Sequence, residues 1–227
     1  MKVDITIPES LADIKLRDYQ KYIKIQGDNK DKDDLFMRQK MVQIFCHVPL
    51  LTVSNMKRKD FLMISNSIRE ILEEKPKLTS IKELNGVNYG FIPDLDNDLS
   101  IGEFVDLGAY MEDWGDFHKA MGVLYRPITA HRKGKYLIEK YDASEKYSTV
   151  MMDMNMDVVM GAVFFFADLA TGLLRITPKY LRTHLAKNPE AAAALEKNGV
   201  GISTFINLLE EACLKLQMLL PHTLARP

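Results

Sequence analysis

The dipeptide Asn85-Gly86 restricts the fold of this chain more than any other feature of the sequence. The two central residues of a tight hairpin turn need positive φ, which asparagine and glycine adopt most readily. Strand-like runs flank the dipeptide, LTSIKEL over 78–84 and VNYGFI over 87–92. Two such runs separated by Asn-Gly predict a β-hairpin that turns at residues 85–86.

Most of the remaining chain has the apolar period of helices. Asp60 is a candidate N-cap, and Ser100 with Glu103 forms a capping box, in which each side chain binds the backbone N–H of the other residue. Asp113 or Asp116 can cap a further helix. The predicted helices cover 11–25, 35–47, 61–72, 100–111, 117–125, 154–174, 178–186, 189–197 and 202–220.

Two further segments are candidate strands. Apolar and polar residues alternate over 3–7, which predicts a short strand before the first helix, and 137–141 is the second candidate. We therefore expect a mainly α fold, a helical bundle with a small β-hairpin element. The expected domains are an N-terminal helical lobe with a short first strand over 1–76, and the hairpin plus a C-terminal helical lobe over 77–227.

Charge and cysteine content narrow the environment of the protein. The net charge of −1 excludes a whole-protein electrostatic drive toward nucleic acid or anionic membranes. The uncharged apolar run 158–167 has about half the length that a membrane-spanning helix needs, and residues 1–15 lack the apolar core of a signal peptide. Cys46 and Cys213 lie in apolar stretches, where we expect buried free thiols. These features predict a cytosolic protein, or one that enters a particle assembled in a cytosol.

Three aspartates at alternate positions, Asp94, Asp96 and Asp98, raise the question of a calcium loop. An EF-hand loop needs glycine at its sixth position and a bidentate glutamate at its twelfth. Counted from Asp94, these positions hold Leu99 and Val105. We therefore predict that the three aspartates bind no calcium and belong to the turn before the next helix.

The sequence contains no recognisable motif for catalysis or cofactor binding. The five histidines do not share metal-ligand spacing with one another or with the cysteines. The glycines of 199–201 lack the lysine of a phosphate loop, and no serine lies in a G-x-S-x-G elbow. The methionine-rich run 151–157 can in principle bind Cu(I), but adaptable packing or a partner-binding face is the favoured interpretation. We predict no catalytic, cofactor-binding or metal-ligating residue, and an uncharacterised enzyme stays as an alternative.

A basic cluster consists of Arg126, His131, Arg132, Lys133 and Lys135. Such a cluster can contact nucleic-acid phosphates, but acidic residues follow it closely and no stacking aromatics are interleaved. A solvated loop is the favoured interpretation, and an acidic protein partner is the next. A regulatory or binding module that uses the loop at 131–135 is therefore an alternative function, and nucleic acid is not an expected partner.

Residue types that are enriched in protein–protein interfaces gather in the middle of the chain. Trp114 has polar, turn-like neighbours, so its ring either lies partly exposed as a contact or packs into the core. The predicted partner-binding residues are Tyr110, Trp114, Tyr125, Arg126, Met152, Met154 and Met156.

Three successive phenylalanines, Phe164 to Phe166, constrain the helix predicted over 154–174. Their side chains span about 200° of the helix circumference, whereas a helix packed on one side has an apolar stripe little wider than about 100°. We expect a central helix, packed against 117–125 and 202–220, with a ring in a partner interface as the alternative.

The central block carries the runs YGFIPDL, SIGEFVDL and MGVLYRP, and MGAVFFFADLATGLL follows at 160–174. In this order the runs, within 85–174, resemble tailed-bacteriophage structural and assembly proteins, among them tail assembly chaperones and neck, connector or baseplate components. The resemblance implies a non-enzymatic protein of virion morphogenesis that contacts other phage structural or assembly proteins, with homo-oligomers as an option and no membrane partner. The implied location is the host cytoplasm during assembly, or the virion.

Overall fold

The computed structural model describes residues 5–29, 34–93, 99–132, 135–143 and 145–169. The chain divides into two compact units, Met1–Ala162 and Val163–Pro227. Helices account for 59% of the described residues, and a four-stranded antiparallel sheet supplies the β structure. The prediction of a mainly α fold with a minor β element is confirmed at this level, although the sheet is larger than a hairpin.

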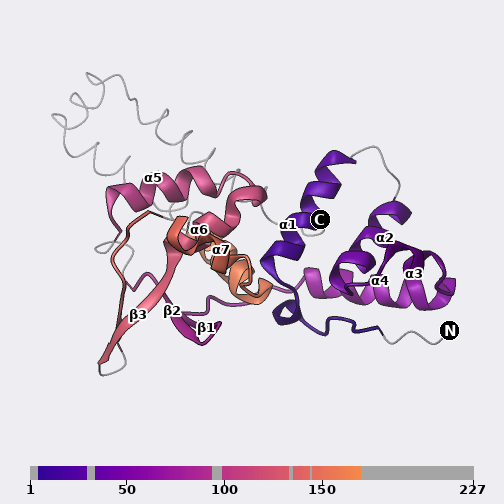
Figure 1. The fold of residues 1–227 in the computed structure, drawn as a ribbon, viewed down its shortest axis with the longest axis horizontal. Helices are drawn as coiled ribbons and strands as arrows, with labels where there is room; N and C mark the ends of the chain where they lie inside the picture. Colours follow the sequence, from indigo (N-terminus) through magenta and orange to yellow (C-terminus); the bar gives the residue numbers. More distant parts are fainter. Residues whose placement is uncertain (1–4, 30–33, 94–98, 133–134, 144, 170–227) are drawn as a thin grey trace, which may run out of the picture. The chain divides into compact units, whose positions relative to one another are not determined.

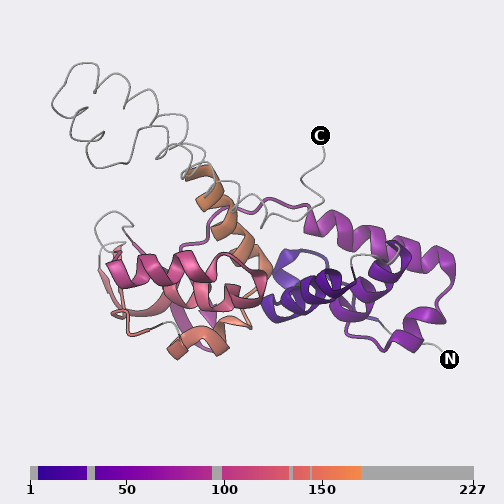
Figure 2. The same ribbon diagram turned by 90° about the horizontal axis from the view of Figure 1, so that it is seen from above.

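The first unit begins with a group of helices around α2 (Figure 1). Helix α2 contacts α1, α3 and α4, and Figure 2 shows the same group from above. One apolar face of each of α2 and α4 is buried, with Val42 and Ile68 fully covered. The elements are η1 (Leu11–Asp13), α1 (Leu16–Asp28), α2 (Asp34–Phe45), α3 (Leu50–Ser54) and α4 (Arg58–Leu72).

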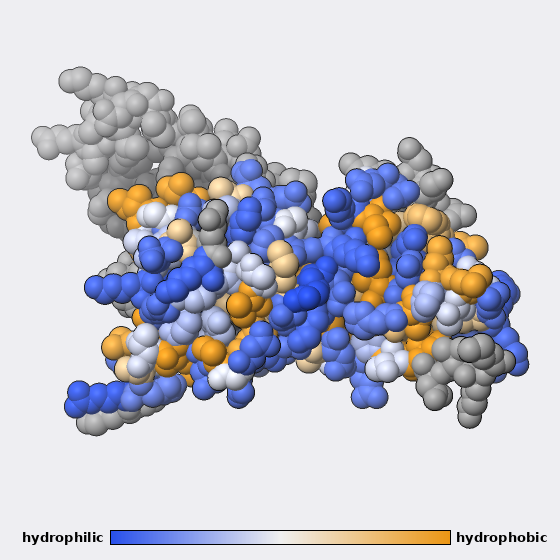
Figure 3. Space-filling model, viewed as in Figure 1, coloured by the Kyte–Doolittle hydropathy of each residue, from blue (hydrophilic) through white to orange (hydrophobic). Residues whose placement is uncertain are grey.

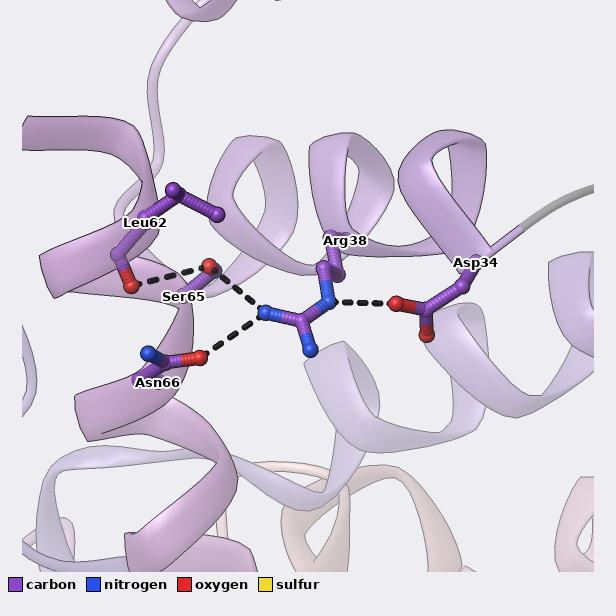
Figure 4. Close-up of polar contacts among 5 residues, drawn as sticks. All are labelled: Asp34, Arg38, Leu62, Ser65 and Asn66. Carbon is purple, nitrogen blue, oxygen red and sulfur yellow. Dashed lines mark hydrogen bonds and ion pairs between the residues drawn. The ribbon is translucent and has the colours of Figure 1, made fainter. Parts of the chain in front are cut away.

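The guanidinium group of Arg38 on α2 forms hydrogen bonds with α4 (Figure 4). Arg38 Nε donates to Asp34 Oδ2 on its own helix at 2.6 Å. Arg38 Nη1 donates to Asn66 Oδ1 at 2.8 Å and to Ser65 Oγ at 3.4 Å on α4, and Ser65 Oγ donates to Leu62 O at 3.2 Å. The fully buried Ser65 hydroxyl therefore has both a donor and an acceptor nearby, as a buried polar group requires.

Two predictions for the N-terminal helices and one for a strand are wrong in detail. The helix predicted over 11–25 is interrupted at Ile14, whose backbone is extended, with φ −100° and ψ 131°. Helix α4 begins at Arg58 after Lys57 as its N-cap, so the predicted cap Asp60 lies in the first turn. Residues 5–9 have no regular secondary structure, and the rest of the predicted strand 3–7 lies outside the described residues.

The interruption at Ile14 has a long-range cause. Lys15 forms an isolated antiparallel bridge with Asn155. Leu16 N donates to Met154 O at 2.9 Å, and Met156 N donates to Ile14 O at 2.8 Å. These bonds keep both segments extended, so the helix that was predicted from residue 154 instead begins at 156.

The second half of the first unit contains the sheet, with strand order β1-β2-β3-β4. The turn between β1 and β2 confirms the predicted hairpin, because Asn85 and Gly86 have φ of 52° and 78°. The strands are β1 (Ile81–Leu84), β2 (Val87–Phe91), β3 (Tyr125–Arg132) and β4 (Lys135–Ile138) (Figure 1).

Strand β3 is absent from the sequence-based prediction, which continued a helix to residue 125. The strand pairs with β2 over 125–127 and with β4 over 128–132. Pro127 is the last residue opposite β2, where it faces Tyr89. A proline, which has no N–H to donate, therefore lies at the point where the pairing partner of β3 changes from β2 to β4.

Helix α6 is buried along almost its whole length and contacts α5, η2, α7 and β3. The predicted capping box at Ser100 and Glu103 is confirmed at the start of α5. Asp113 caps η2 by accepting a hydrogen bond from Gly115 N at 3.0 Å. The elements are α5 (Ile101–Tyr110), η2 (Trp114–Asp116), α6 (Phe117–Leu124) and α7 (Glu145–Met151).

A further helical segment covers residues 156–169. Residues 158–163 are buried, whereas Phe164, Phe165 and Phe166 are each half-buried. The rings of Phe165 and Phe166 meet edge to face, with centroids 5.4 Å apart. The predicted continuation to 174 and the helices predicted over 178–186, 189–197 and 202–220 lie outside the described residues.

The predicted domain boundary between residues 76 and 77 stays a prediction. Within the first unit, α1 lies before this boundary and η2 after it, and the two pack against each other. Gln20 Nε2 donates to Trp114 O at 2.6 Å. The two halves of the first unit are therefore joined by a partly buried hydrogen bond as well as by the chain.

Candidate protein-binding surface

Helix α5 has apolar side chains on two faces. One face is buried and includes Leu107. On the other face Ile101, Phe104 and Val105 keep 84%, 68% and 61% of their surface exposed. Gly108 and Ala109, one turn further on, are exposed as well. We name these five residues the α5 stripe, and Figure 3 shows apolar surface over α5 at the upper left.

The start of α5 is set by the capping box. Ser100 Oγ accepts a hydrogen bond from Glu103 N at 3.3 Å. In return, Ser100 N donates to Glu103 Oε2 at 2.7 Å. These bonds satisfy two backbone N–H groups that would otherwise have no partner at the helix start. The carboxylate of Glu103 is thereby turned toward the protein interior.

Glu103 also forms a buried ion pair with Arg126 of β3. Burial by itself would raise the pKa of Glu103, but the hydrogen bonds from Ser100 and Arg126 and the charge of Arg126 hold that pKa below its ordinary value. The Arg126 guanidinium lies 5.6 Å from the ring centre of Tyr141, whose hydroxyl donates to Asp106 on α5. Two polar contacts thus attach α5 to the sheet and to the segment that follows it.

The ion pair determines which face of α5 points outward. Successive helical residues are about 100° apart, so Ile101, Val105 and Gly108 lie about 140–200° around the helix from Glu103. Because Glu103 is held against Arg126, these three residues face away from the protein. Neither Gly102 nor Gly108 would have a heavy atom within 4 Å of an added Cβ, so the space beside them is open.

The structure places most of the predicted partner-binding residues in the interior. Tyr110 and Met152 are half-buried. The others contribute to the packing of this chain, so they present little surface to a partner in this structure. The buried ones are Trp114, Tyr125, Arg126, Met154 and Met156.

Of the two alternatives for Trp114, a partly exposed contact or a ring packed in the core, the structure shows the second. Its ring meets that of Tyr19 edge to face at 4.7 Å and lies 4.6 Å from the ring of Phe117. Only 6% of the residue is exposed. Trp114 begins the short helix η2, which turns the indole inward, while the carboxylates of the neighbouring Glu112, Asp113 and Asp116 stay at the surface. Asp116, for example, pairs there with Lys119 at 2.8 Å.

The methionine-rich run is likewise internal. Met152 O accepts a hydrogen bond from Arg17 N at 3.0 Å, beside the bridge at Lys15 and Asn155. Met154 and Met156 are fully buried. The run therefore serves as the partner of residues 14–17 within this chain, and Met151, Met154 and Met156 fill the core.

The basic cluster is smaller than predicted. Arg126 belongs to the buried pair at the beginning of β3, away from the other members. His131, Arg132 and Lys135 are exposed at the far end of the β3–β4 hairpin, and Lys133 lies outside the described residues. The His131 ring lies 5.9 Å from that of Tyr136, so an aromatic group is present beside the cluster.

In the described part of the chain, no group of three histidine, cysteine, aspartate or glutamate side chains is arranged to hold a metal ion. Asp94, Asp96, Asp98 and Cys213 lie outside this part. Cys46 is a buried free thiol, and burial raises its pKa to about 11. Within the same residues, no helix has the length and apolar character needed to cross a membrane.

The α5 stripe was missed by sequence reasoning, although its signal was present. Ile101, Phe104 and Val105 have helical spacing, but so do Leu107 and Met111 on the other side of the helix. A helix that is apolar on two faces is expected to be buried on both.

No protein-family model, curated protein or solved structure matches the chain.

Proposed function

We propose that this chain is a non-enzymatic assembly or structural protein of a tailed bacteriophage, which acts in virion morphogenesis by binding other proteins. The observation that carries the proposal is the exposed α5 stripe. The exposed fractions of Ile101, Phe104 and Val105 correspond to about 400 Å² of apolar surface. Contiguous apolar patches of this size on soluble proteins are often functional.

The chemistry of the stripe supports binding rather than catalysis. Its five residues have no titratable, nucleophilic or metal-ligating side chain. Glu103 and Arg126 are paired with each other behind the helix, and Asp106 accepts a hydrogen bond from Tyr141. The capping box and this ion pair also hold α5 in one orientation, so little conformational entropy is lost when a partner binds.

The place of the stripe in the sequence supports a role in phage assembly. It lies in the run SIGEFVDLGAY, within the segment that resembles phage structural and assembly proteins. The partners are then other phage structural or assembly proteins. The chain acts in the host cytoplasm during assembly, or as part of the virion.

The experiment is complementation of the phage that encodes the chain. Phage lacking the gene are grown with wild-type protein, Phe104→Ser or Leu51→Ser. Leu51 is a matched control, because it is also an exposed apolar helical residue, with 72% of its surface exposed, but lies on α3. Phe104→Ser is expected to lower the yield of particles at least tenfold, whereas Leu51→Ser leaves it unchanged.

Circular dichroism establishes that both variants are folded before the yields are compared. If Phe104→Ser gives the same yield of particles as wild type, the α5 stripe has no role in assembly. Normal particles in the complete absence of the protein would overturn the proposed function itself.

A further inference from the structure

We infer that Gln20 and His118 form an acid-sensitive joint between the two halves of the first unit. Protonation of the His118 ring displaces the Gln20 amide and loosens the packing of α1 against η2. The inference goes beyond the proposed function, because it concerns the contact between α1 and η2 and not the α5 stripe. It rests on the hydrogen bonds that meet at one side-chain amide.

Three acceptors surround the side-chain nitrogen of Gln20. Gln20 Nε2 donates to Trp114 O at 2.6 Å and to Gly115 O at 3.1 Å, both on η2. Nδ1 of His118, near the start of α6, lies 3.1 Å from the same nitrogen. Two carbonyl oxygens at these distances require the N–H side of the amide, because they would repel its oxygen. Nδ1 of His118 therefore presents a lone pair, and the hydrogen of the neutral ring is on Nε2.

Protonation places a hydrogen on Nδ1 of His118 and reverses this contact. The protonated ring is a donor at both nitrogens, so two N–H groups face each other across 3.1 Å. The Gly115 backbone offers an acceptor to the protonated ring, since its hydrogen bond raises the pKa of His118. When His118 takes this oxygen, Gln20 loses one of its two carbonyl partners, and the charged ring repels its amide.

Burial makes the joint sensitive to this change. Only 9% of His118 is exposed and Gln20 is half-buried, so water is a poor substitute for a lost partner. The start of α1 stays in place, because the hydrogen bonds between residues 14–17 and 152–156 hold it. The change is therefore confined to the part of α1 that packs against η2.

The surroundings of His118 set the pH at which its ring changes state. Burial and the charge of Lys119 lower the pKa of His118, and they outweigh the opposite effects of Asp116 and the Gly115 backbone. The ring is therefore protonated only at a pH below its ordinary pKa of 6.5. Because the pKa is lower in the folded than in the unfolded chain, the stability that the joint contributes is complete above pH 6.5. It is lost as the pH falls through the folded pKa.

Ionic groups on the other elements that pack against α6 or belong to α1 make separate contacts. The pairs are Glu103 of α5 with Arg126 of β3, Lys146 of α7 with Glu139, and Asp18 of α1 with His47. Burial raises the pKa of Asp18, so it is a second group on α1 that acid can protonate. A variant without the His118 ring separates the two effects.

The test uses Trp114, the single tryptophan of the chain, as a reporter. Its ring packs against Tyr19 of α1, so loosening of α1 exposes the indole. Fluorescence quenching of the full chain by acrylamide is measured between about pH 7.5 and pH 5, where ordinary carboxylates stay largely ionised. NMR follows the titration of the His118 ring under the same conditions. Wild-type protein is expected to be quenched more strongly in acid, with a midpoint below pH 6.5 that matches the His118 titration.

Two variants test the joint with different signs. His118→Asn is expected to show constant quenching, because an asparagine oxygen can accept from Gln20 but does not titrate. In Gln20→Glu a carboxylate faces the His118 ring and the two carbonyl oxygens, so the contact is favoured by protonation. Quenching of Gln20→Glu is therefore expected to be weaker at pH 5 than at pH 7.5. If His118→Asn fails to fold, the direction of the pH dependence in Gln20→Glu decides.

Three results overturn the inference. Equal pH dependence in wild type and His118→Asn would assign the acid response to another group, such as Asp18. Constant quenching of wild type while His118 titrates would mean that the joint accommodates the protonated ring. A His118 ring that stays neutral down to pH 5 would mean that the joint does not respond to acid in this range.

Discussion

Gly161 provides a sharp test of the packing, because two physical effects predict opposite results for Gly161→Ala. The residue lies inside the helical segment 156–169. Alanine is preferred over glycine in a helix interior by about 1 kcal/mol, so propensity predicts a more stable protein. In the structure, however, a Cβ at this position would lie 2.5 Å from Lys77 O and 3.3 Å from Leu78 Cα.

The steric effect should prevail. Real Cβ atoms essentially never approach another heavy atom within 3.0 Å, so the two backbones must separate. No rotamer change can relieve the contact, because the atoms that are met belong to the main chain, and residues 158–163 beside Gly161 are buried. Overpacking of this kind costs about 1–3 kcal/mol. Because both groups in contact are backbone, we take a steric cost of about 2–3 kcal/mol. The gain of about 1 kcal/mol in helix propensity is subtracted from it. We therefore expect Gly161→Ala to lower the free energy of unfolding by about 1–2 kcal/mol.

The assay is urea unfolding at micromolar protein concentration, with Gly108→Ala as the matched control. Gly108 is also helical, but an added Cβ there meets nothing within 4 Å. Gly108→Ala is therefore expected to stabilise the protein by about 0.5–1 kcal/mol. If Gly161→Ala is as stable as wild type or more so, residues 77–78 do not pack against this helix and the reasoning is refuted.

Three further substitutions test the buried contacts. Glu103→Gln leaves the Arg126 charge buried without a counter-ion and should cost about 3–5 kcal/mol at pH 7. The pKa of Glu103 in the folded protein is below its ordinary value of 4.5, so the extra stability of wild type over Glu103→Gln is fully present above pH 4.5 and should shrink as the pH falls further. If the difference in unfolding free energy from urea curves is the same at pH 7 and at acid pH, this reasoning is wrong. Trp114→Ala should cost about 3–5 kcal/mol in thermal unfolding, and a loss of less than about 1 kcal/mol would place the ring outside the core. Gly90→Ala would bring a Cβ to 2.5 Å from Tyr136 Cε2 and 3.0 Å from Ile138 Cγ2 and should cost about 1–3 kcal/mol. Most of this cost should be lost in a Tyr136→Ala background, and an unchanged cost there would contradict the contact with the ring.

The features that sequence reasoning predicted correctly depend on a few neighbouring residues. The hairpin follows from the φ preferences of Asn85 and Gly86. The start of α5 follows from a reciprocal pair of hydrogen bonds between Ser100 and Glu103. In both cases the chemistry that decides the structure lies within four positions of the chain, so a local pattern is sufficient.

The features that were missed depend on distant partners. Pro127 argues against a central strand, and β3 tolerates it only because the pairing changes from β2 to β4 there. The interruption at Ile14 is caused by residues 154–156, which have no mark of strand pairing in the local sequence. Tertiary hydrogen bonds override helical periodicity at both places.

The candidate site was harder to predict than the fold. Trp114 has polar neighbours in the chain, yet its ring packs between Tyr19 and Phe117 because η2 turns it inward. For α5, the apolar pattern does not reveal which face is exposed. That choice is made by the pairing of Glu103 with Arg126, 23 residues away on a strand that was not predicted.

The bridge between residues 14–17 and 152–156 also affects how the chain folds as it is made. Lys15 Nζ donates to the backbone oxygen of Asp153, 138 residues further along the chain. At the rates of protein synthesis, the ribosome needs roughly 7–30 s to reach Asp153 after Lys15. During that interval Ile14 and Leu16, both buried in the finished protein, lack the segment that covers them. The first unit therefore cannot complete its packing until residues 152–156 have been made.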